Sequence, residues 1–68
     1  MAETMAQKRA LRAEVRSAVV AMAKQRGERK TAEFLGVTLR MVQHYKAGTW
    51  PSLPRAKAFA PLLGVKVP

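Results

Sequence analysis

The chain has 68 residues, no cysteine, a single histidine and a formal net charge of +9, from 13 Lys and Arg residues against four acidic ones. This length allows one small domain, and the composition excludes disulfide cross-links and the usual zinc sites. Nothing after Glu33 is acidic, so the positive charge dominates the second half of the chain. A domain this basic attracts polyanions, of which nucleic acid is the commonest inside cells.

The sequence contains no apolar run that approaches the ~20 residues needed to cross a bilayer. Lys8, Arg9, Arg12 and Arg16 interrupt any apolar signal core near the N-terminus. We therefore expect a soluble, cytoplasmic protein with no membrane partner.

The first predicted element is a long helix. Residues 1–6 have no strong pattern, so we expect a flexible N-terminus and then one domain over residues 7–68. Strong helix formers dominate residues 7–26 and predict a helix there. Within it Leu11, Val15, Val19 and Met22 recur at helical spacing, which predicts one buried stripe. Gly27 is the expected stop.

Two short helices are predicted next, around a tight turn. The first starts near Lys30 or Thr31 and closes at Gly36, because glycine readily takes the positive φ that ends a helix sharply. Thr38 is a suitable N-cap for the second, which runs to residue 47 before another glycine.

A fourth helix is predicted after the loop formed by residues 50–54. Ser52 or Leu53 is its expected cap, with Pro54 in the first turn. Pro61 would remove one backbone hydrogen bond, so we expect a kink or break there. The inward face is predicted to consist of Leu53, Ala56, Ala60 and Leu63. The fold class is therefore all-α, a small bundle of four to five helices.

The stretch "KTAEFLGVTLRMVQHYKAG", residues 30–48, has the helix, glycine turn and helix of a helix-turn-helix motif. Such a motif needs a small residue where the helices cross, and Ala32 supplies it. Leu35 gives the apolar residue before the turn, and Gly36 and Val37 form the turn and its anchor. Two inward residues of the second helix, Val42 and Tyr45, complete the pattern.

In this motif the second helix lies in the DNA major groove with its N-terminal part against the base edges. Arginine can pair bidentately with guanine and glutamine with adenine, and leucine can pack on a thymine methyl group. The predicted base-reading residues are Leu39, Arg40, Gln43 and His44. Phosphate contacts come from helix starts and flanking cations. The predicted phosphate-contacting residues are Lys30, Thr31, Thr38, Lys46 and Arg55.

The same stretch resembles the helix-turn-helix of phage Cro-type repressors and of phage CII-type activators, most closely over "KTAEFLGV". The likeness to the CII type extends from "ALRAEV" in the first helix to "WPS" and the terminal "LGV". The resemblance implies a lambda-repressor-like DNA-binding fold and a regulator of transcription in a bacterial host cell or its nucleoid. It also implies three partners: an operator duplex, a second copy of the chain that pairs in solution or only on DNA, and RNA polymerase.

Other functions remain open at this stage. A non-specific nucleic-acid-binding or architectural protein needs only the charge of +9. An interaction module, such as the binding half of an antitoxin or an excisionase accessory factor, would use Phe34 and Trp50. We expect Phe34 to pack on the first helix, unless it marks a partner surface, and Trp50 to anchor its loop rather than stack on a base. We expect no enzyme activity, cofactor or metal, because the sequence contains no paired carboxylates, activated nucleophile or phosphate-cradling loop.

Overall fold

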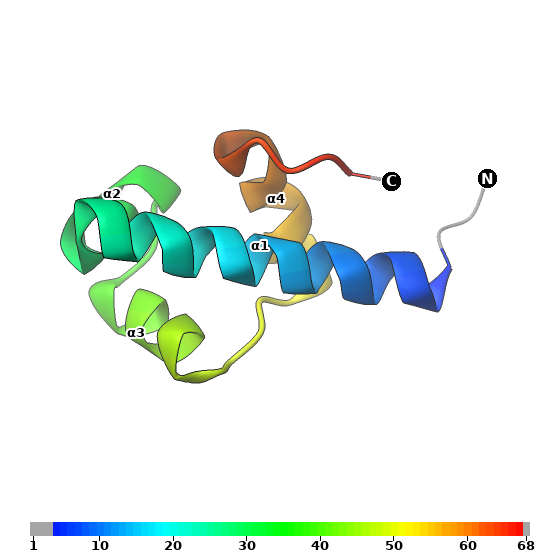
Figure 1. Cartoon of the computed structure of the whole chain (residues 1–68), viewed down its shortest axis with the longest axis horizontal. Coiled ribbons are helices and arrows are strands. Elements are labelled where there is room, and N and C mark those ends of the chain that lie inside the picture. The colour runs from blue at the N-terminus through cyan, green and yellow to red at the C-terminus, as the bar shows by residue number, and fades with distance from the viewer. Residues whose placement is uncertain (1–3, 68) are drawn as a thin grey trace.

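The longest element is α1, Met5–Arg26, which contacts each of the other three helices (Figure 1). A computed structural model describes residues 4–67 of the chain. Leu11, Val15 and Val19 are buried along one side of α1, as the stripe predicts. Ala23, rather than Met22, continues the buried row, because it lies one further turn of four residues after Val19.

The N-terminus of α1 lies two residues before the predicted start. Thr4 Oγ1 accepts a hydrogen bond from the Gln7 N–H (3.0 Å), and Gln7 Oε1 accepts one from the Thr4 N–H (2.8 Å). This reciprocal capping box satisfies two backbone donors and sets the start of the helix at Met5. Residues 1–3 of the predicted flexible segment lie outside the described residues, as does Pro68.

Two short helices, α2 (Glu28–Leu35) and α3 (Leu39–Ala47), follow α1. The predicted start of α2 at Lys30 or Thr31 is wrong by two to three residues, because Gly27 takes a positive φ of 90° and lets α2 begin directly after α1. The predicted Thr38 cap of α3 is confirmed, since its side chain accepts a hydrogen bond from the Met41 N–H.

The last helix, α4 (Leu53–Leu63), starts where the sequence predicts, with Ser52 as its cap and Pro54 in the first turn. The predicted break at Pro61 does not occur, and the helix continues to Leu63. Pro61 is exposed and lies in the last turns, so its missing N–H removes a bond only near the helix end. The buried neighbours Phe59 and Ala60 hold α4 against α1.

The core lies where α1 meets the other three helices. Its main cluster of buried side chains is Leu11, Val15, Val19, Leu35, Tyr45, Ala56, Phe59 and Ala60. A smaller cluster joins Ala23, Ala32 and Val42, and Val37 packs against both. The all-α prediction is confirmed: residues 4–67 contain four helices and no strand. No helix within this span is long and apolar enough to cross a membrane.

Candidate nucleic-acid interface

The connection between α2 and α3 is a short, fully hydrogen-bonded turn. Gly36 adopts the left-handed conformation (φ 72°, ψ 32°), which costs glycine little. The Gly36 N–H donates to the Glu33 carbonyl (3.3 Å) and the Val37 N–H donates to the Ala32 carbonyl (3.0 Å). These two bonds form a Schellman motif, which satisfies the last carbonyls of α2 and reverses the chain. The sequence-predicted glycine turn is therefore present.

The inner side of α3 is buried against α1 and α2. Val42 has no exposed surface and packs with Ala23 and Ala32, while Tyr45 is 3% exposed in the main cluster. Ala32 is the small residue predicted where the two short helices approach each other, and this prediction is confirmed. Burial of Val42 and Tyr45 fixes which side of α3 faces outward.

All four residues predicted to read bases lie on the outward side of α3. Leu39, Arg40, Gln43 and His44 are exposed, and they form two pairs four residues apart, so they share one helix face. Leu39 is 37% exposed although it is a large apolar residue. The structure thus gathers an apolar side chain, a guanidinium, an amide and an imidazole on a single surface.

The residues predicted to contact phosphate do not all share this exposure. Lys30, Thr38 and Arg55 are exposed. Thr31 differs from them, because its side chain is fully buried and its hydroxyl donates to the Gly27 carbonyl (2.9 Å). The cause is the earlier start of α2, which moves Thr31 from the expected helix start to the inside of the first turn.

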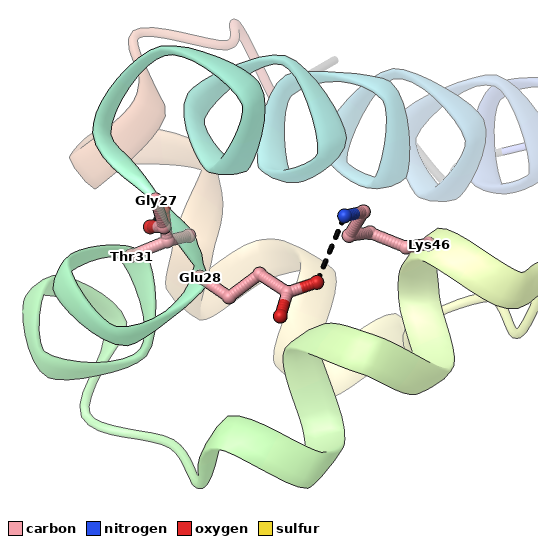
Figure 2. A network of polar contacts seen from close by, with 4 residues as sticks. All are labelled: Gly27, Glu28, Thr31 and Lys46. Carbon is pink, nitrogen blue, oxygen red and sulfur yellow. Dashed lines mark hydrogen bonds and ion pairs between the residues drawn. The ribbon is translucent and has the colours of Figure 1, made fainter.

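Lys46, the fifth of these residues, forms an ion pair across the two short helices. Its Nζ lies 2.8 Å from Glu28 Oε2, which ties the end of α3 to the start of α2 (Figure 2). The hydrogen bond from Lys46 is the main cause of a lowered pKa for the Glu28 carboxyl, and Gln43 also contributes. Glu28 is therefore the acidic group that holds Lys46, one of the candidate DNA-contacting side chains.

Glu28 is expected to make the fold more sensitive to acid. Its pKa is lowered in the folded state, so its contribution to stability is present above the ordinary value of 4.5 and is lost as the pH falls through the lower folded value. We expect the Tm of the wild-type protein to drop more steeply with acid than that of Glu28→Gln, as measured by circular dichroism. Glu33→Gln, on the exposed side of the same helix, is the control and should keep the wild-type profile. Identical profiles for the wild type and Glu28→Gln would contradict this role.

Two arginines of α1 to which the sequence analysis gave no role in the site hold the end of α3 and the loop after it. Arg16 Nε donates to the Tyr45 carbonyl (2.9 Å), and Arg12 Nε donates to the Pro51 carbonyl (2.8 Å). Carbonyls near a helix C-terminus need such donors. The signal was available in the sequence, because each arginine directly follows a residue of the buried stripe and therefore lies at its edge.

A shallow groove of about 190 Å³ continues the outward side of α3 toward α4, and Trp50 lies at it. Trp50 is 40% exposed, and the centre of its ring lies 5.7 Å from the Arg12 guanidinium carbon. The indole therefore anchors its loop only in part, whereas the neighbouring Pro51 is buried. Burial raises the pKa of the Tyr45 hydroxyl, an effect that nearby Arg55 partly opposes. The groove is lined by Met41, His44, Tyr45, Thr49, Trp50, Pro51, Ser52 and Arg55.

Among residues 4–67, no three His, Asp or Glu side chains are grouped so that they could hold a metal ion.

Comparison of the chain with protein-family models, with curated proteins and with solved structures finds no match.

Proposed function

We propose that the chain is a sequence-specific double-stranded DNA-binding regulator of transcription, a repressor of the phage Cro kind. In this proposal α2 and α3 act as a helix-turn-helix and α3 enters the major groove. The observation that carries it is the exposed row on α3, whose other side is buried in the core. A helix held in this way can present side chains to base edges without losing its packing.

The chemistry of the exposed row suits the base edges of the major groove. Arg40 offers two parallel donors for guanine, and Gln43 offers a donor and an acceptor for adenine. Leu39 matches a thymine methyl group, and His44 can donate to or accept from a base or a phosphate. Each bidentate pair contributes about 1–3 kcal/mol of discrimination between bases.

Phosphate contacts are assigned to the exposed residues around this row. Lys30 lies in the first turn of α2, Thr38 caps α3 and Arg55 lies in the first turn of α4. The proposal no longer includes Thr31, whose side chain is buried. Lys46 is included with its Glu28 partner, because its side chain remains 38% exposed in the ion pair.

A second candidate function is non-specific binding of nucleic acid, which the net charge of +9 favours. Such binding depends on the release of counterions and is insensitive to sequence, with a slope of about 0.9 per phosphate neutralised in a plot of log affinity against log salt. The exposed amide and guanidinium on α3 favour the sequence-specific proposal, because a purely charge-driven surface needs neither a glutamine nor a leucine at its centre.

The test is a titration against two duplexes at several salt concentrations. The first is the duplex enriched by in vitro selection from a random pool, and the second is a scrambled duplex of equal composition. The proposal expects the selected duplex to bind at least about 1,000-fold more tightly at moderate salt, the low end of the range for specific regulators. Failure of selection to enrich any sequence, with affinities that fall together as salt rises, would leave the non-specific function in its place.

A further inference from the structure

A second groove, separate from the candidate nucleic-acid interface, lies at the N-terminal end of α1. It has a volume of about 530 Å³, and all its lining residues come from α1 and the first turn of α4. None of them belongs to α2 or α3. The lining residues are Met5, Ala6, Lys8, Arg9, Arg12 and Leu53.

This end of α1 is helical but contains no buried residue. The first buried residue of α1 is Leu11, so about 9 Å of helix, six residues at 1.5 Å each, precede the core. Figure 1 shows this end of α1 extending past α4. The Thr4–Gln7 capping box keeps it helical, yet Met5 remains 79% exposed. A partner would therefore meet a helix that is already formed, which lowers the entropic cost of binding.

The groove combines apolar surface with concentrated positive charge. Leu53 is half-buried at one side, and Met5 supplies a flexible thioether of the kind that adapts to varied partners. Lys8, Arg9 and Arg12 supply the charge, and among residues 4–67 no acidic residue lines the groove. Arg12 is held in place by its 2.8 Å bond to the Pro51 carbonyl.

We propose that this groove docks an acidic amphipathic helix of a partner protein. Such a helix offers both apolar side chains for Met5 and Leu53 and carboxylates for the three cations. A second copy of the chain fits poorly, because it would bring its own net charge of +9 against the same surface. A duplex would supply phosphates but no apolar side chains to cover Met5. The docked helix leaves the exposed row of α3 open, so the proposal does not depend on DNA binding.

The test is fluorescence anisotropy with a labelled synthetic peptide of about 18 residues, long enough to form a helix, with Glu on one face and Leu on the other. The wild-type protein is expected to bind it with 1:1 stoichiometry. Arg9→Glu and Met5→Gln should each weaken binding at least tenfold. Both residues are exposed, so circular dichroism and Tm should be unchanged. Lys24→Glu is the charge-matched control, about 22 Å from Arg9 along α1, and should weaken binding less than threefold.

Three results would overturn the docking proposal. One is the absence of 1:1 binding, and another is an equal loss in Arg9→Glu and Lys24→Glu, which would mean that only net charge matters. The third is displacement of the peptide by a scrambled duplex in the wild-type protein but not in Arg9→Glu, which would assign the groove to nucleic acid. Because the peptide titration uses no selected duplex, its failure is distinguishable from failure of the proposed regulatory function.

Discussion

Phe59→Ala is expected to remove a large share of the protein's free energy of unfolding. Phe59 is 5% exposed and packs in the main core cluster against α1. Truncation of a buried phenylalanine to alanine typically costs about 3–5 kcal/mol, because transfer energy is lost and a cavity remains. A domain of this size has a total stability of roughly 3–10 kcal/mol at typical values per residue. Urea unfolding followed by circular dichroism at 222 nm would measure the loss.

The chain offers a matched control, because it has only one other phenylalanine. Phe34 lies on α2 and is 44% exposed. Phe34→Ala makes the same chemical change where few contacts are lost, so the expected loss of stability is below about 1 kcal/mol. Equal losses in the two variants would mean that α2 packs differently from this structure, with Phe34 against α1.

The two phenylalanines also show where sequence reasoning reached its limit. Sequence analysis expected Phe34 to pack on the first helix and did not place Phe59 in the core, whereas the structure buries Phe59 and exposes Phe34. Phe34 and Phe59 lie in helices of 8 and 11 residues, where periodicity alone defines the inner face only weakly and no motif fixes the place of either phenylalanine. The direction of such a helix is set by tertiary contacts that the local pattern does not contain.

The long helix and the turn were predictable, because their signals are local. Leu11, Val15 and Val19 repeat over two turns, so the buried side of α1 follows from spacing alone. Gly36 followed by Thr38 specifies a helix end and a helix start within three residues. The start of α2 was less predictable, because Gly27 serves both as the C-cap of α1 and as the N-cap of α2.

Within the candidate site, exposure was easier to predict than pairing. The outward face of α3 followed from the burial of Val42 and Tyr45, so Arg40 and Gln43 were placed correctly as exposed residues. The Glu28–Lys46 ion pair and the Arg16 bond to the Tyr45 carbonyl join residues 18 and 29 positions apart. Such contacts depend on how whole helices pack, which residue spacing along the chain does not specify.

Arg40→Ala and Gln43→Ala are expected to relax base discrimination without harming the fold. Both side chains are exposed on α3, so little packing is lost. If each makes one bidentate base contact, each substitution costs about 1–3 kcal/mol on the selected duplex, or roughly 5- to 150-fold in affinity. Binding to the scrambled duplex should fall much less in Gln43→Ala, which removes no charge. Anisotropy titrations of both duplexes at one salt concentration measure the ratio of the affinities for the selected and the scrambled duplex.

Lys30→Ala separates base reading from charge in the same experiment. Lys30 is exposed on α2, is not part of the row on α3, and is assigned to phosphate. Its loss should weaken both duplexes by a similar factor and lower the salt slope by about one. If Gln43→Ala instead behaves like Lys30→Ala and leaves the ratio of affinities for the two duplexes unchanged, the exposed row does not read bases. The affinity of the protein for DNA would then come from its positive charge, because no directional contact on α3 would remain to distinguish one sequence from another.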